Sequence, residues 1–298
     1  MIASRPLAAT PIPSVAPPRT GVMWLLRRMR LAAVGLFVLA LAVVAAVFAP
    51  WLAPHDPAAV SLVDRLLPPL SASHFFGTDA LGQDVLSRVI FGARISLLVG
   101  FCAVAISGAI GVSLGLLSGF FGGWVDAGIM RVSEIQLAFP TIILYVAVMA
   151  VVGPGLEKLI AVIGIVGWVQ YARVERAMTL SLRELEYVQA ARALGASNGW
   201  IMLRHILPNT LGPLTVVASF GLASTIVIEA SLSFLGLGVP PSVASWGSML
   251  SDGRDYLRAG WWVATFPGLA LTLCVLAVNL LGDWLRDELD PLLKHATT

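Results

Sequence analysis

One stretch of this sequence has the spacing of a nucleophile turn. Residues 111–115 read Gly-Val-Ser-Leu-Gly, which matches the G-x-S-x-G pattern of a reactive serine held between glycines. Such a serine needs a base within hydrogen-bond reach. The histidines His55, His74, His205 and His295 all fall in expected loops, and no expected membrane span contains a His, Lys or Asp. We therefore predict no catalytic residue and a chain that is not an enzyme.

Nucleotide and metal chemistry are also missing from the sequence. It has no G-x-x-x-x-G-K-[ST] run, so the chain cannot supply its own nucleotide site. Cys102 and Cys274 lie inside apolar runs, where buried free thiols are expected and where the spacing supports neither a disulfide nor a metal site. The prediction is that this chain holds no cofactor and no metal.

A secondary transporter would place ionisable groups inside the membrane to couple ions to its substrate. Only Glu229 comes close, at the outer end of the fifth expected span. It is either an interfacial carboxylate, alone or paired with an arginine, or a group that lines the outer part of a substrate path and meets a cationic group of the substrate. The scarcity of buried charge indicates that energy enters from a partner.

The composition is that of an all-α membrane protein. The 298 residues are 58% hydrophobic and 12% charged, with a net charge of +2, whereas soluble domains carry about 25% charged residues. A spanning helix needs about 20 mostly apolar residues. Six candidate spans follow from this rule, at residues 31–49, 95–118, 135–152, 159–172, 213–228 and 260–282.

Two of these spans are irregular. Pro140 lies inside the third, where a kink is expected. The fourth has only 14 residues without charge, which is about 21 Å of helix, short for a bilayer core of about 30 Å.

The spans divide the chain into regions. We predict a Pro-rich disordered tail over 1–24, a first span with a polar extramembrane element over 25–92, a membrane core that holds the other spans over 93–282 and a tail over 283–298. A cleavable signal peptide is the alternative for the N-terminal segment.

Positive charges predict the orientation. The loops on the side of the two termini hold 13 of the 19 Lys and Arg residues, and the other side holds 6. The richer side faces the cytoplasm. Both termini and the polar segment 173–204 are therefore expected in the cytoplasm, and the loop 51–94 outside.

Small residues recur every fourth position in the second span, at Ser107, Gly111, Gly115 and Gly119. This spacing puts them on one helical face, where another helix can approach closely. The alternative is that glycine is simply common in membrane helices.

The polar segment around 187–209 has the pattern of two short amphipathic helices hinged at Gly195. Ser181 and Glu184 have the spacing of a capping box that begins the first helix. Ser197 or the residue after it caps the second, and Pro208 ends it. A segment this long predicts a docking surface for another protein, and a helical hairpin on lipid headgroups is the alternative.

This segment resembles the EAA loop of ABC-importer permeases through Gln189-Ala190-Ala191, Gly195 and Leu207-Pro208. Gln189 stands where the pattern has glutamate, and His205 where it has an aliphatic residue. The resemblance implies that the loop inserts into a groove of a cytoplasmic ATPase and transmits its closure. The coupling residues that it implies are Tyr187, Gln189, Ala190, Ala191, Arg192, Gly195, Ala196, Ser197, Leu207 and Pro208.

Four further runs are similar to the C-type permease subunit of dipeptide and oligopeptide importers. They are FFGTDALGQDVLSRVIFGARISL at 75–97, EASLSFLGLGVPP at 229–241, SWGSML at 245–250 and LLGDWLRDELDP at 280–291. The resemblance implies the type I ABC importer permease fold in a bacterial plasma (inner) membrane. It implies import of short peptides, with D,D-dipeptides as a candidate; nickel or glutathione import is the alternative, followed by an independent secondary transporter.

The same resemblance implies the partners. They are a homologous second permease subunit, two cytoplasmic subunits that bind ATP and Mg²⁺, an extracytoplasmic substrate-binding protein and membrane lipid. No nucleic acid is implied.

Overall fold

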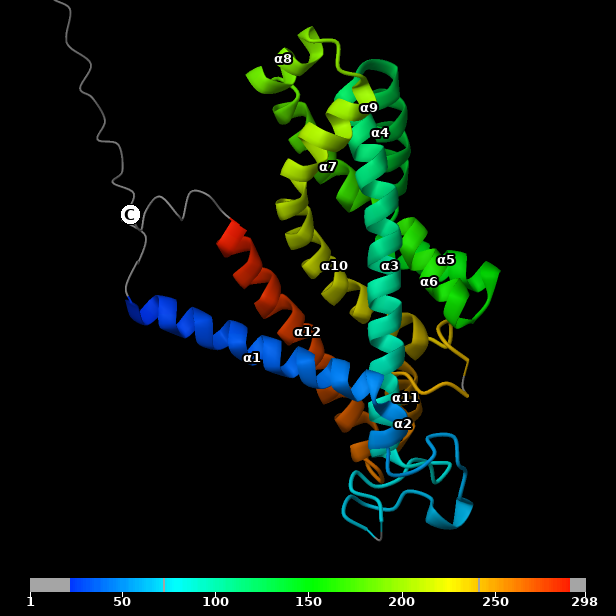
Figure 1. Cartoon of the computed structure of the whole chain (residues 1–298). Helices are drawn as coiled ribbons and strands as arrows, with labels where there is room; N and C mark the ends of the chain where they lie inside the picture. The colour runs from blue at the N-terminus through cyan, green and yellow to red at the C-terminus, as the bar shows by residue number, and fades with distance from the viewer. Residues whose placement is uncertain (1–21, 72, 241, 290–298) are drawn as a thin grey trace, which may run out of the picture.

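The computed structural model describes residues 22–71, 73–240 and 242–289, and its long elements are helices (Figure 1). Within these residues, β pairing is limited to two isolated bridges, Ser71–His74 and Thr78–Asp84. The helices are α1 (Val22–Val47), α2 (Ala49–Leu52), α3 (Val85–Phe121), α4 (Gly123–Leu137), α5 (Thr141–Val152), α6 (Leu156–Val166), α7 (Trp168–Leu182), α8 (Glu186–Ala193), α9 (Asn198–Ile201), α10 (Leu207–Phe234), α11 (Trp246–Gly253) and α12 (Trp262–Leu289). Short 3₁₀ turns occupy Leu62–Asp64 and Arg254–Tyr256.

Helix α3 is the axis of the molecule. Its 37 residues make a rod of about 55 Å. Asp84 caps its first turn by accepting from the Ser87 backbone N–H, and it ends at Gly122, which has a φ of +65°. In Figure 1 the irregular cap of residues 53–84 covers one end of α3, and α8 and α9 lie at the other end.

Four helical segments are long and apolar enough to cross a membrane. They are Arg30–Val47, Val85–Phe121, Asn198–Phe234 and Trp262–Leu289, and a fifth is present if α4 and α5 are taken together as one bent span. Two of the six predicted spans therefore lack a single straight helix in the described part of the chain.

The third predicted span is broken rather than kinked. Helix α4 ends before Pro140, α5 begins after it, and the two axes differ by 87°. Proline lacks the N–H that would continue the helix. Residues 123–134, expected as a connection, instead form most of α4.

The fourth predicted span is divided at Gly167, between α6 and α7. A side chain at Gly167 would collide with the Ser107 hydroxyl oxygen of α3, so the junction lies directly against the central helix.

The predicted tails differ at their boundaries. Helix α1 already begins at Val22, and residues 1–21 of the predicted N-terminal tail lie outside the described residues. Helix α12 continues to Leu289, so the first seven residues of the predicted 283–298 tail are helical. The remainder, 290–298, lies outside the described residues.

Apolar packing joins the long helices along α3. One cluster brings α1, α3, α10 and α12 together around Leu97, Ile226 and Cys274. A second joins α3, α5, α6 and α10 around Met149 and Leu159. Both cysteines are free thiols; Cys274 is buried, as predicted, whereas Cys102 is only half-buried.

Much of the outer surface is apolar. Phe37 on α1 is 68% exposed, and only 11% of the apolar window of α1 is buried. A large exposed apolar surface is expected for helices that are surrounded by the hydrocarbon core of a lipid bilayer.

Candidate functional site

The four small residues of α3 lie against α6 and α7. Ser107 Oγ donates to the Gly164 carbonyl oxygen at 2.8 Å. A Cβ built on Gly111 would stand 2.6 Å from Cβ of Tyr171, and one built on Gly119 would stand 2.6 Å from Cβ of Thr179. Any side chain at these glycines would push the helices apart.

Polar contacts hold the same helices together near the far end of α3. The Arg176 guanidinium of α7 donates to both carboxylate oxygens of Asp126 on α4, at 2.5 and 2.6 Å. Ser118 of α3 donates to the same carboxylate at 2.5 Å. Arg183, just after α7, donates to the Gly119 carbonyl oxygen at 2.7 Å. Helices α3, α4 and α7 therefore form one braced unit at this end.

The polar segment after α7 folds into two short helices. Helix α8 ends at Ala193, and Gly195 takes a φ of +83°, a conformation that favours glycine. Ser197 caps α9 by accepting from the Trp200 backbone N–H at 3.3 Å. The predicted hinge and cap are both confirmed.

The predicted capping box at the start of the first helix was wrong. Ser181 lies inside α7, which runs to Leu182, so it caps no helix start. The N-cap of α8 is Leu185, which makes no side-chain cap.

Pro208 does not end a helix. Residues 202–206 form a π turn, in which the Leu207 N–H bonds to the Met202 carbonyl oxygen, and Pro208 lies in the first turn of α10. The wider π turn changes the hydrogen-bond pattern just where Pro208 has no N–H to give. Residues 198–234 therefore form one continuous helical segment.

The inner face of α8 and α9 packs on the end of α3. Val188 and Ile201 are fully buried against Leu116 and Phe120 of α3. The Arg192 guanidinium lies over the Phe120 ring, 5.4 Å from its centroid. The two short helices are thus docked on α3 through an apolar contact.

The outer face of the same helices forms an open groove of about 670 Å³. Leu194 on this groove is 88% exposed. His205 lies between two aromatic rings, with centroids 4.6 Å from Trp200 and 5.8 Å from Tyr187. The groove is lined by Tyr187, Ala190, Ala191, Leu194, Gly195, Ala196, Ser197, Trp200 and His205.

Six of the ten predicted coupling residues line this groove, and four have other surroundings. Gln189 donates to the Arg183 carbonyl oxygen at 2.9 Å. Arg192 covers Phe120, Leu207 packs beneath the groove, and Pro208 begins α10. The prediction missed Leu194, Trp200 and His205 as lining residues, although the exposed apolar Leu194 just before the hinge was a usable signal.

A cavity of about 550 Å³ lies between α3, α4, α5, α6, α7 and α10. The Gln136 amide at its edge donates to the Val166 carbonyl oxygen at 2.6 Å and accepts from the Trp168 indole N–H at 3.0 Å. Arg173 also lines it, with no carboxylate partner among the described ion pairs. Its polar lining residues include Ser107, Gln136, Thr141, Gln170, Tyr171, Arg173, Ser224 and Thr225.

No local pattern in the sequence indicates this cavity. Its lining residues are scattered from position 107 to position 228, and only the packing of the helices brings them together.

Glu229 is fully buried between α3 and α10. Ser96 Oγ and Ser233 Oγ each donate to its carboxylate at 2.8 Å. Serine hydroxyls are therefore its partners here, where an arginine was considered. A role for Glu229 on a substrate path stays a prediction.

Sequence comparison shows which proteins this chain is similar to. The profile of the family described as "Binding-protein-dependent transport system inner membrane component" matches residues 111–295, and that of the "N-terminal TM domain of oligopeptide transport permease C" matches residues 19–69. The chain is 43% identical over 269 residues to the dipeptide transport system permease protein of Alkalihalophilus pseudofirmus, covering 90% of this chain and 88% of the relative. It is 44% identical over 270 residues to the probable D,D-dipeptide transport system permease protein of Escherichia coli strain K12, covering 91% and 90%.

A solved structure resembles the fold. In the inward-facing MetNI methionine ABC transporter, one chain superposes with a TM-score of 0.53 at 22% identity, covering 69% of this chain and 96% of that chain. Similarity at this level concerns the fold alone.

Proposed function

We propose that this chain, which belongs to the family of binding-protein-dependent transport system inner membrane components, is the permease subunit of an ABC importer for short peptides. The observation that carries the proposal is the groove on α8 and α9. It is an exposed, partly apolar surface that is held on the end of α3 by a buried apolar contact. A subunit that receives movement from a partner needs such a surface.

Two cytoplasmic ATP-binding subunits would occupy the groove of this chain and that of a homologous second permease subunit. ATP and Mg²⁺ belong to those partners. The exposed Leu194 beside Trp200 suits insertion into an apolar groove of an ATPase. Gln189 is bonded to the chain's own backbone, so we assign it a role in shaping α8 rather than in contacting the ATPase.

The groove end is proposed to face the cytoplasm of a bacterium, with both termini on that side, and the cap of residues 53–84 to face outward. Arg176, Arg183 and Arg192 all belong to the groove end, which supports this orientation. An extracytoplasmic substrate-binding protein would then deliver peptide at the cap end.

Six spans agree with this arrangement if α4 with α5 makes the third and α6 with α7 makes the fourth. Helix α7 carries Arg173 and Arg176 in its middle. These charges are tolerated because the helix lies against α3 and α10 and beside the cavity.

The cavity between the helices is proposed as this subunit's share of the substrate path. A short peptide at neutral pH carries a carboxylate at its C-terminus, and the Arg173 guanidinium has no carboxylate partner among the described residues. Arg is suited to bidentate contact with a carboxylate. The Gln170 amide and the Thr225 hydroxyl, which also line the cavity, can form hydrogen bonds with the peptide backbone.

The mechanism follows from these positions. When the ATPases bind ATP and close, α8 and α9 move with them. The braced unit of α3, α4 and α7 carries this movement to the cavity, whose opening changes from the inner to the outer side. Hydrolysis resets the arrangement after a peptide has entered.

Reconstitution of the full transporter in proteoliposomes tests the proposal. We expect uptake of a labelled dipeptide that requires ATP, both ATPases and the binding protein. Uptake by this chain alone would make it a secondary carrier. ATP-dependent uptake of Ni²⁺ or of glutathione, without uptake of dipeptides or D,D-dipeptides, would overturn the peptide assignment.

A further inference from the structure

The cap of residues 53–84 has little regular structure to hold it in place. One 3₁₀ turn and the two isolated bridges are its regular backbone features. Its apolar anchor is a small cluster that includes Phe76 and Leu66 against Trp262. Segments of this size with a small core commonly depend on a further constraint, such as a disulfide or a metal, and both cysteines lie elsewhere.

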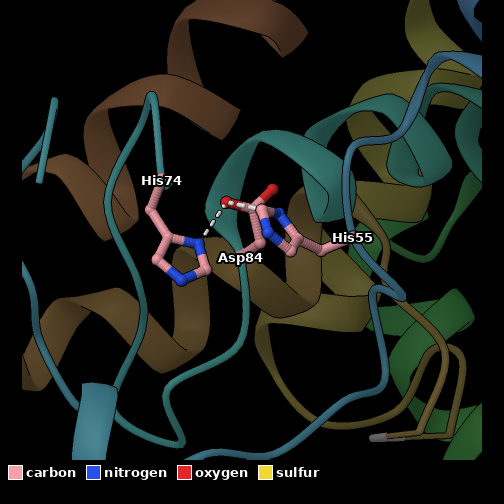
Figure 2. A group of neighbouring side chains, drawn as sticks. All are labelled: His55, His74 and Asp84. Atoms are coloured by element: carbon pink, nitrogen blue, oxygen red, sulfur yellow. Dashed lines mark hydrogen bonds and ion pairs between the residues drawn. The ribbon is translucent and has the colours of Figure 1, made fainter. Parts of the chain in front are cut away.

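Three side chains of metal-ligating type meet where the cap joins α3 (Figure 2). His55 follows α2, His74 lies in the loop before Phe75, and Asp84 is the N-cap of α3. One ligand atom from each lies within 4.8 Å of the others. His74 Nδ1 is 2.9 Å from Asp84 Oδ1, and His55 Nδ1 is 3.8 Å from the same oxygen.

The geometry is close to that of a metal centre. Two ligand atoms on a tetrahedral Zn²⁺ with bonds of about 2.1 Å are about 3.4 Å apart. The pairs at 2.9 and 3.8 Å lie on either side of that separation, and the two imidazole ligand atoms lie within 4.8 Å of each other. His55 Nδ1 is shielded from solvent and has no hydrogen-bond partner among the described residues, whereas buried polar atoms usually have one.

The surroundings orient the carboxylate. Asp84 is 2% exposed, and its Oδ2 accepts from the Ser87 N–H at 2.8 Å and from Ser87 Oγ at 2.7 Å. Its Oδ1 therefore faces the two imidazoles. Ser87 Oγ also accepts from the backbone N–H of His55 at 3.1 Å. Such outer-shell hydrogen bonds are what hold metal ligands in position.

We propose that His55, His74 and Asp84 form a binding site for a divalent cation of the zinc class, which clamps the cap onto the start of α3. Two imidazoles and one carboxylate suit Zn²⁺ and related transition ions better than Ca²⁺ or Mg²⁺. The ion would take the place of the hydrogen bond between His74 Nδ1 and Asp84 Oδ1 and would also bind His55 Nδ1. Water would complete the coordination.

The prediction of no metal was based on the spacing of the two cysteines. His55, His74 and Asp84 are separated by 19 and 10 positions and fit no common ligand spacing. The proposal is independent of the substrate and of the coupling surface. It concerns a site at the opposite end of α3 from the groove.

Zinc binding to the tag-free, full-length chain in its purified complex tests the proposal. After chelator treatment, Zn²⁺ is titrated in competition with a chromogenic chelator. We expect one site per chain that is lost or weakened by at least about 10- to 100-fold in His55→Gln and His74→Gln, which is the range for disturbing a metal's surroundings. Asp84→Asn keeps a residue that can cap α3 and should weaken binding similarly.

His205→Gln is the matched control, because it removes a histidine at the far end of α3 and should leave zinc affinity unchanged. Thermal unfolding is the second readout: a chelator should lower the melting temperature of the wild type but not that of His74→Gln. Absence of stoichiometric zinc, or equal affinity in the wild type and a well-folded His74→Gln protein, would overturn the site.

Discussion

Gly115 of α3 lies directly on the backbone of Ala172 of α7: a Cβ built on Gly115 would stand 2.5 Å from the Ala172 carbonyl oxygen. The opposing atom belongs to the backbone, so it cannot rotate away as the end of a flexible side chain could. This contact explains why the second long span repeats small residues every fourth position. It also means that the braced unit depends on the absence of a side chain.

A Gly115→Val substitution should therefore destabilise the folded chain by about 1–3 kcal/mol, the usual cost of forcing extra atoms into a packed contact. Gly128→Val is the control, because a Cβ at this helical glycine of α4 meets nothing within 4 Å. Thermal unfolding of the purified complexes provides the comparison. Equal melting temperatures for the two variants would show that the α3–α7 contact is not tight in the protein.

A Leu194→Asp substitution should weaken the association of the ATPase subunits. Burying a leucine side chain is worth about 1.5–3 kcal/mol, so we expect a loss of roughly 10- to 100-fold in affinity. The fold should be unaffected, since Leu194 is 88% exposed. The measurement is binding of the purified ATPases to the permease pair in detergent.

Val63→Asp is the control for this substitution. Val63 is 94% exposed but belongs to the cap at the opposite end of α3, so ATPase binding should remain normal. Full ATPase affinity in a correctly inserted Leu194→Asp variant would show that the groove is not the docking surface.

An Ala191→Arg substitution should uncouple ATP hydrolysis from uptake, because Ala191 lines the groove and also packs toward the buried cluster below it. A long charged side chain there would shift α8 relative to α3. Hydrolysis and dipeptide uptake are measured on the same proteoliposomes, and uptake per ATP should fall. Normal uptake by this variant, once correct insertion is established, would contradict a coupling role.

An Arg173→Gln substitution should slow dipeptide uptake by about tenfold or more, because a hydrogen bond to a charged group contributes about 1.5–3 kcal/mol. Arg173→Lys keeps the charge and should retain more of the rate. Initial uptake rates are measured at saturating peptide-loaded binding protein, with ATP hydrolysis followed in parallel. Unchanged uptake in the Gln variant would exclude Arg173 from the substrate path.

An Arg176→Met substitution should destabilise the chain by about 1.5–3 kcal/mol, because Asp126 would lose two charge-assisted hydrogen bonds in a partly buried place. Arg131→Met removes the arginine of an exposed pair with Glu134, and such pairs contribute about 0–1 kcal/mol. The two variants are compared by thermal unfolding. A similar small effect from both would mean that α4 and α7 are not held by this ion pair.

Local chemistry explains which details of the polar segment were predictable. The hinge at Gly195 and the cap by Ser197 depend on the residue itself and its near neighbours. The positions of Ser181 inside α7 and of Pro208 in the first turn of α10 do not depend on near neighbours alone. Packing of α7 along α3 extends α7 past Ser181, and a π turn lets the helix pass through Pro208.

The sequence by itself determined the family, the membrane setting, the small-residue repeat and the hinge at Gly195 in the polar segment, because composition, periodicity and local motifs are carried by neighbouring residues. Only the tertiary structure decided that α4 and α5 meet at 87° and that Arg173 shares a cavity with residues of several helices. It alone brought His55 and His74 to Asp84. Contacts between distant residues depend on how helices cross and where loops return, and no local pattern encodes that geometry.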